Sequence, residues 1–131
     1  FLTYVNGAPF QPAVANALDL GDEFYATLAS DLQRKRDLLS DGLRAAGFDV
    51  FPSRGTYFVV TDAAPLGYDD GIELCRRLPE LAGVAAVPVA VFHDDPGDAR
   101  SLVRFAFCKR DDVLAEAVQR LSRLRPGRAV R

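Results

Sequence analysis

Residues Ser101 to Lys109, S-L-V-R-F-A-F-C-K, place one arginine inside an otherwise apolar run. Strict alternation of side chains predicts a β-strand with two different faces. One face carries Val103, Phe105 and Phe107, and the other carries Leu102, Arg104, Ala106 and Cys108. A guanidinium keeps its charge, so a half-buried one needs an anion, and its fork of donors fits a carboxylate. Arg104 is therefore a candidate carboxylate clamp, or else the partner of one of the chain's own acids.

The bulk composition is that of one globular domain. A chain of 131 residues, 49% hydrophobic and 26% charged, can bury a core of its own. A net charge of −2 argues against a nucleic-acid partner, and no apolar run is long enough to span a membrane. Cys75 and Cys108 lie in separate apolar patterns, so we expect buried free thiols, as in a reducing cytoplasm. The chain contains no methionine and starts with Phe1-Leu2, so we expect a piece of a longer protein.

Hydrophobic periodicity and turn residues predict the order of the elements. In the first half we expect an extended lead-in (1–11), a short helix after Pro12 (13–18), a long helix with an apolar stripe (24–43) ended by Gly47, and two strands joined by a turn (48–51 and 56–61). In the second half we expect a helix capped by Asp69 or Asp70, a strand (84–92), a polar loop (93–100), the Arg104 strand, and a helix capped by Asp111 or Asp112 that runs to Leu124.

This order predicts an α/β fold, close to the α+β class. We expect a small mixed sheet of about four strands covered by helices and preceded by the long linking helix.

A second motif, Gly55-Thr56-Tyr57-Phe58, opens the strand before the middle of the chain. A glycine there lets a ligand approach the backbone, and Thr56 and Tyr57 add hydroxyls. The alternative is an ordinary turn glycine followed by an aromatic strand. No metal-site spacing occurs, and neither Lys35 nor Lys109 has the apolar surroundings of a Schiff-base lysine, so we expect no catalytic centre within this chain.

Taken in order, six segments resemble the carboxyl-terminal part of fold-type I, class I/II pyridoxal-phosphate aminotransferases. The nearest subgroup comprises the kynurenine–oxoglutarate and N-succinyldiaminopimelate aminotransferases. The resemblance covers the chain from about Phe1 to Leu124. The segments are P-F-Q-P-A-V-A-N-A-L (9–18), L-Q-R-K-R-D-L-L (32–39), G-L-R-A-A-G-F-D-V-F-P (42–52), G-T-Y-F (55–58), G-V-A-A-V-P-V-A-V-F (83–92) and V-R-F-A-F-C-K (103–109).

The resemblance implies roles for particular residues. The arginine of the family's R-F-x-F motif grips the substrate α-carboxylate, and Arg104 occupies that position. The family's Gly-Thr-Tyr-Phe strand lines the small-domain side of the active cleft, which gives Gly55, Thr56 and Tyr57 a substrate-binding role. The stretch from Tyr4 to Asn6 is similar to one that approaches the neighbouring subunit's site. Residues 1–20 would belong to the edge of the large domain, and residues 21–131 would form the small domain.

The family's Schiff-base lysine, pyridinium-pairing aspartate, cofactor-stacking aromatic and phosphate-binding arginine have no counterpart in this chain. The resemblance thus implies a cytoplasmic, homodimeric parent enzyme that holds pyridoxal 5′-phosphate and exchanges an amino group between an amino acid and a 2-oxo acid. Its missing N-terminal large domain would be the partner of this chain, which alone would be inactive. The alternatives are a non-catalytic module that binds small carboxylates and a truncated remnant of such an enzyme.

Overall fold

The computed structural model describes residues 7–124, and the chain divides into two compact units, Phe1–Asp31 and Leu32–Arg131. The described part of the first unit holds a 3-10 turn, η1 (Ala8–Phe10), and helix α1 (Gln11–Leu18). We had expected an extended lead-in here. Prolines at the start of η1 and of α1 explain the difference, because their fixed φ suits the first turn of a helix as well as an extended chain.

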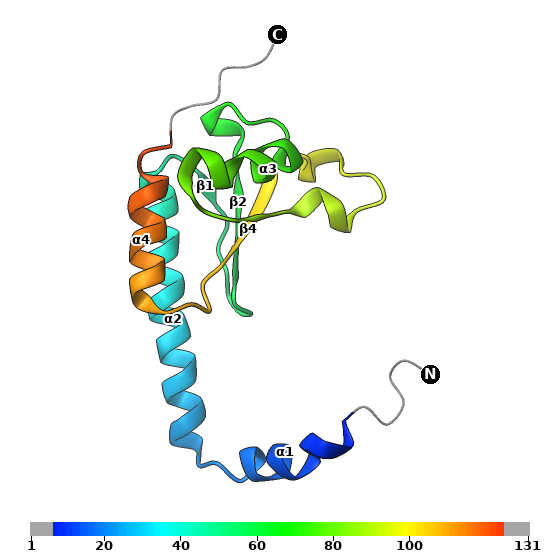
Figure 1. The fold of residues 1–131 in the computed structure, drawn as a ribbon, viewed down its shortest axis with the longest axis vertical. Helices are drawn as coiled ribbons and strands as arrows, with labels where there is room; N and C mark the ends of the chain where they lie inside the picture. Colours follow the sequence, from blue (N-terminus) through cyan, green and yellow to red (C-terminus); the bar gives the residue numbers. More distant parts are fainter. Residues whose placement is uncertain (1–6, 125–131) are drawn as a thin grey trace. The chain divides into compact units, whose positions relative to one another are not determined.

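Helix α2 (Asp22–Ala45) is the predicted long helix and continues into the second unit (Figure 1). Acidic residues occupy its first turn and Arg44 its last, which suits the helix dipole at both ends. Gly47 follows with a φ of +97°, as predicted for a residue that ends a helix. Only the C-terminal half of the predicted apolar stripe is buried, at Leu39 and Leu43, whereas Phe24 and Leu28 are exposed.

Four strands form one sheet in the order β1-β2-β4-β3. Their bounds are Asp49–Val50 for β1, Phe58–Asp62 for β2, Val87–Pro88 for β3 and Leu102–Ala106 for β4. The α/β class and the four strands are confirmed, but every pairing is antiparallel, so our expectation of a mixed sheet was wrong. The crossover connection from β2 makes β3 parallel to it in direction, but β4 lies between the two strands and pairs antiparallel with both. The alternation of side chains in a sequence does not show which strands become neighbours in the sheet.

The strand predicted over residues 84–92 is much shorter than expected. Only Val87–Pro88 pairs with β4, and a 3-10 turn, η3 (Val89–Phe92), follows at once. Pro88 has no N–H to donate to a ladder, which limits pairing at this edge of the sheet.

Helix α3 (Gly71–Ala82) starts where the sequence predicted. Asp70 is its cap, because its Oδ1 accepts hydrogen bonds from the N–H groups of Ile72 (2.9 Å) and Glu73 (3.1 Å). These bonds, led by the one from Glu73, lower the pKa of the Asp70 carboxyl. Pro79 lies inside α3, three residues before its end.

Helix α4 (Asp111–Leu121) starts without a side-chain cap, so the predicted capping by Asp111 or Asp112 was wrong. Both carboxylates pair with arginines instead, Asp111 with Arg34 and Asp112 with Arg110. These ion pairs compete with the backbone for the carboxylate oxygens. Both acids still lie in the first turn, where the helix dipole favours negative charge.

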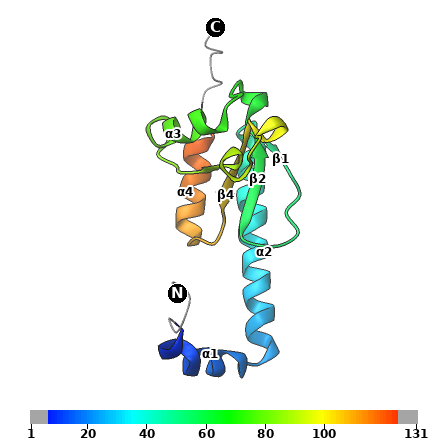
Figure 2. The same cartoon turned by 90° about the vertical axis from the view of Figure 1, so that its right-hand side faces the viewer.

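The core of the second unit lies between one face of the sheet and three helical segments: the C-terminal half of α2, α3 and α4. The C-terminal half of α2 and α4 run side by side (Figures 1 and 2), and Gly42 faces Val118 where they meet. Alternate residues of β2 and β4 are buried against this layer, and the remaining residues of both strands are half-buried on the opposite, open face. The most buried side chains are Leu43, Val59, Thr61, Leu74, Leu78, Val103, Phe107 and Leu121.

The two cysteines are free, as predicted, but they differ in burial. Cys75 on α3 is half-buried, and burial raises the pKa of its thiol to about 11. Cys108 is exposed, so the expectation that it is buried was wrong. Since β4 ends at Ala106, Cys108 lies beyond the strand and outside its packing.

Candidate functional site

Arg104 lies at the centre of the open face of the sheet. It occupies the middle of β4, in register with Val60 on one side and Val87 on the other. Its side chain is half-buried, its Nε atom is buried without a hydrogen-bond partner, and no acid among residues 7–124 forms an ion pair with it. A buried donor that makes no hydrogen bond destabilises the folded state. Of the two alternatives that the sequence left open, the described residues thus do not support pairing with the chain's own acids.

Two aromatic rings hold the Arg104 guanidinium. Its central carbon lies 4.2 Å from the centroid of the Phe58 ring and 4.4 Å from that of the Phe92 ring. Cation–π contacts of this kind fix a guanidinium without using its N–H donors. These contacts therefore leave the Nε–H of Arg104 without a hydrogen-bond acceptor.

A cavity of about 400 Å³ adjoins this guanidinium, and we call it the Arg104 pocket. Its lining contains two arginines and no acidic side chain. Such a surface favours an anionic ligand small enough to fit the cavity. The residues that line it are Phe51, Pro52, Ser53, Arg54, Gly55, Thr56, Phe58, Val60 and Arg104.

Ser53 organises the loop that forms one wall of the pocket. Its hydroxyl Oγ lies 3.0 Å from the carbonyl oxygen of Gly55 and 3.0 Å from that of Phe58. The carbonyl of Ser53 itself accepts a hydrogen bond of 3.1 Å from Nη1 of Arg36, a half-buried residue of α2 that also pairs with Asp37. The loop is thus tied both to itself and to the helix layer.

The backbone of this loop is unusual at Thr56 and not at Gly55. Thr56 has a φ of +58°, which β-branched residues rarely adopt, and its Oγ1 accepts a 3.3 Å hydrogen bond from the Phe58 N–H. A Cβ added at Gly55 would meet nothing within 4 Å, so the backbone there faces open space. Strained residues of this kind cluster at functional sites.

The predicted site residues are only partly brought together. Arg104, Gly55 and Thr56 line the same pocket, whereas Tyr57 is 49% exposed, lies against the Phe58 ring, and is not part of the lining. Tyr4 and Asn6 lie outside the described residues. Ser53, Arg54 and Phe92 were missed. The first two directly precede the predicted glycine and could have been found there, but the approach of Phe92 depends on the tertiary fold.

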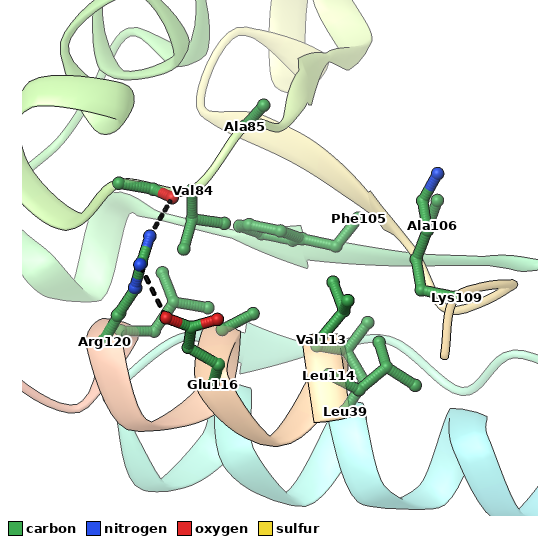
Figure 3. A pocket seen from close by; sticks show the side chains of 13 residues that line it. Leu39, Val84, Ala85, Phe105, Ala106, Lys109, Val113, Leu114, Glu116 and Arg120 are labelled. Atoms are coloured by element: carbon green, nitrogen blue, oxygen red, sulfur yellow. Dashed lines mark hydrogen bonds and ion pairs between the residues drawn. The ribbon is translucent and has the colours of Figure 1, made fainter. Parts of the chain in front are cut away.

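A second pocket, of about 260 Å³, lies between α4, β4 and residues 83–85 (Figure 3). Phe105, which follows Arg104 and faces the other side of the sheet, contributes to its largely apolar lining. At one end Arg120 donates a 3.0 Å hydrogen bond to the carbonyl of Gly83 and pairs with Glu116 at 2.6 Å. Arg120 and Glu116 neutralise each other. This pocket therefore has no buried, unpaired donor that could bind a carboxylate. The Arg104 pocket is the better candidate site.

Other kinds of site are not apparent in residues 7–124. No group of histidine, cysteine, aspartate or glutamate side chains there could hold a metal ion. None of the helices in that range is long and apolar enough to cross a membrane.

Comparison with known proteins decides the family. The family model for aminotransferase class I and II matches residues 2–121. The chain belongs to the class I and II aminotransferases. The resemblance inferred from the sequence is thereby confirmed.

Among curated members of the family, a probable N-succinyldiaminopimelate aminotransferase of Mycobacterium tuberculosis is 52% identical over 130 residues, which cover 93% of this chain and 33% of the relative. A methionine aminotransferase of Escherichia coli is 35% identical over 95% of this chain and 32% of its own length. The chain thus spans about a third of the curated relatives that it matches.

Solved structures of family members agree with the fold. The structure of N-succinyldiaminopimelate aminotransferase from Mycobacterium tuberculosis matches with a TM-score of 0.87 and 55% identity, over 94% of this chain and 32% of that structure. The structure of a methionine aminotransferase from Escherichia coli matches with a TM-score of 0.80 and 35% identity, over 88% and 30%. The fold described above is therefore one found within longer aminotransferases.

Proposed function

We propose that this chain forms the small domain of an aminotransferase that moves an amino group between an amino acid and a 2-oxo acid, and that Arg104 binds the substrate α-carboxylate. The observation that carries the proposal is the half-buried Arg104, whose Nε has no partner within residues 7–124 and whose pocket contains no acid. A carboxylate would supply the missing acceptor and could engage two N–H groups at once. Gly55 and Thr56 would form the opposite wall.

The cofactor of the whole protein would be pyridoxal 5′-phosphate, which acts as an electron sink for the substrate α-carbon. Neither lysine of the described residues is suited to attach this cofactor covalently. Lys109 is exposed beyond the end of β4, and Lys35, a half-buried residue of α2, does not line the Arg104 pocket. We therefore assign cofactor attachment to the remainder of the protein, and to this chain only the binding and orientation of substrate.

The same proposal includes a cytoplasmic homodimer in which Tyr4 and Asn6 approach the site of the neighbouring subunit. It leaves residues 1–20 with the large domain. The family membership supports these assignments.

The test uses the full-length enzyme and replaces Arg104 with methionine. Loss of a half-buried charged partner should lower kcat/KM for amino acid substrates by roughly 100-fold or more. Arg76→Met is the matched control, because Arg76 is an exposed arginine of α3 outside the pocket lining. An unchanged kcat/KM in Arg104→Met would contradict the proposed role.

A second candidate, a non-catalytic module for small carboxylates, is favoured by one observation: the unit Leu32–Arg131 contains both a buried core and the Arg104 pocket. Such a module would bind a 2-oxo acid saturably as the isolated chain, and Arg104→Met would abolish that binding. Transaminase activity in the full-length protein would decide in favour of the enzyme.

A further inference from the structure

Arg36 of α2 does not line the Arg104 pocket, but it is bonded to the loop that forms one wall of it. From a half-buried position its Nη1 donates a hydrogen bond of 3.1 Å to the carbonyl of Ser53. We propose that Arg36 is a positioning residue, which holds this loop and the Phe58 ring where Arg104 needs them to bind a carboxylate. The inference rests on the proposed function of Arg104, and it adds a residue that acts on the clamp without touching substrate.

The connection from Arg36 to the clamp passes through Ser53. The Ser53 hydroxyl lies 3.0 Å from the carbonyl oxygen of Gly55, which lines the pocket, and 3.0 Å from that of Phe58. The Phe58 ring in turn has its centroid 4.2 Å from the guanidinium carbon of Arg104. A shift of Ser53 would therefore move both the pocket wall and one of the rings that orient the guanidinium.

The loop depends on such contacts because part of its backbone is strained. Thr56, between Ser53 and Phe58, has a φ of +58°. A β-branched residue persists in that conformation only where the surrounding structure holds it there. The Ser53 hydroxyl provides contacts within the loop, and Arg36 provides one to the helix layer. Without Arg36, we expect the loop to spend less time in the conformation that forms the pocket wall.

Arg36 acts through the position of the loop more than through its charge. Its Nε and Nη2 lie 2.8 Å and 2.7 Å from Oδ1 of Asp37, and this carboxylate neutralises it. A neutralised pair adds little to the potential that attracts an anion into a neighbouring cavity. Loss of Arg36 would also leave Asp37 unpaired, so a control variant must leave a similar carboxylate unpaired.

The test measures KM in the full-length enzyme for an L-amino acid and for the amine that lacks its α-carboxylate. In Arg36→Met, KM for the amino acid should rise roughly three- to tenfold with kcat nearly unchanged, while KM for the amine stays within about twofold. A loss of stability alone would reduce the amount of active enzyme and leave KM as it is. Arg36→Lys keeps a charged donor without the planar fork and should restore part of the original KM.

Arg44→Met is the matched control. Arg44 lies on the same helix, pairs with Asp41 at 2.9 Å, and has no hydrogen bond to residues 52–56 among those that the structure describes. Its replacement also leaves an aspartate of α2 unpaired. It should change neither KM.

A double variant separates this inference from the proposed function. In the Arg104→Met background, Arg36→Met should have no further effect on KM, because no clamp remains to be positioned. An unchanged KM in Arg36→Met, an equal rise for amino acid and amine, or an undiminished effect in that background would overturn the role of Arg36 and leave the clamp standing. If Arg104→Met itself leaves kcat/KM for the amino acid unchanged, the clamp is overturned, and the role of Arg36 falls with it.

Discussion

The guanidinium carbon of Arg104 lies 4.4 Å from the centroid of the Phe92 ring, although the Phe92 side chain is 59% exposed. An exposed cation–π contact contributes about 0.5–1 kcal/mol. In the full-length enzyme, Phe92→Leu should therefore raise KM for amino acid substrates about two- to fivefold, with kcat nearly unchanged, because the clamp is less well positioned. Phe92→Tyr keeps an aromatic ring and should retain the original KM. A fall in kcat with constant KM would contradict this role.

The Ser53 hydroxyl has one hydrogen but two carbonyl acceptors, each at 3.0 Å, so it shares or alternates between them. Ser53→Ala should lower the free energy of unfolding by about 1 kcal/mol, since it leaves the loop without this link. Ser30→Ala is a suitable control, because Ser30 is exposed on α2 and bonds only within its own helix. Urea unfolding measures both variants, and equal losses would show that Ser53 has no special role.

Close packing of α2 against α4 depends on the absence of a side chain at Gly42. A Cβ built there falls 2.9 Å from the Cβ of Val118 and closer still to its methyl carbons. Gly42→Ala should lower the free energy of unfolding by roughly 1–3 kcal/mol, since a branched side chain in a packed interface cannot move aside. Gly21→Ala, where an added Cβ meets nothing within 4 Å, should change it little. Thermal unfolding midpoints of the two variants test this, and a stable Gly42→Ala would show that the helices can separate.

The Asp70 cap predicts a pH dependence of stability. Hydrogen bonds from the N–H groups of Glu73 and Ile72, together with Arg100, lower the pKa of the Asp70 carboxyl in the folded chain. A carboxyl whose pKa is lowered on folding stabilises the folded chain at pH values above its pKa in the unfolded chain, which is near 4. That stabilisation is lost as the pH falls through the pKa of the carboxyl in the folded chain. Asp70→Asn keeps an acceptor oxygen but does not titrate. Between about pH 6 and pH 2, the free energy of unfolding measured in urea should fall more steeply for the original chain than for Asp70→Asn. Parallel pH profiles of the two chains would exclude this contribution of Asp70.

Local patterns were sufficient to predict much of the fold. Alternation around Arg104 predicted both faces of β4, and the spacing of leucines with Gly47 predicted α2 and its end. Each of these signals depends on residues close together in the sequence. Such signals failed where another interaction competed, as at Asp111, whose carboxylate binds Arg34 instead of the helix backbone.

The candidate site was predictable only in part, for a related reason. The charge of Arg104 inside an apolar strand identifies it without a structure. Its aromatic neighbours come from β2 and from η3, and the loop wall is tied to Arg36 on α2, so their convergence depends on long-range contacts. The loop also has a left-handed backbone at Thr56, a β-branched residue for which local propensity would not predict it.

The most direct test of the central claim is a cycle between Arg104 and the carboxylate it is proposed to bind. The full-length enzyme and its Arg104→Met variant are assayed with an L-amino acid and with the amine that lacks its α-carboxylate. If Arg104 binds that carboxylate, the variant should lose roughly 100-fold or more in kcat/KM with the amino acid, yet stay within about threefold with the amine. Equal losses with both substrates would contradict the account, because Arg104 would then act on something other than the α-carboxylate.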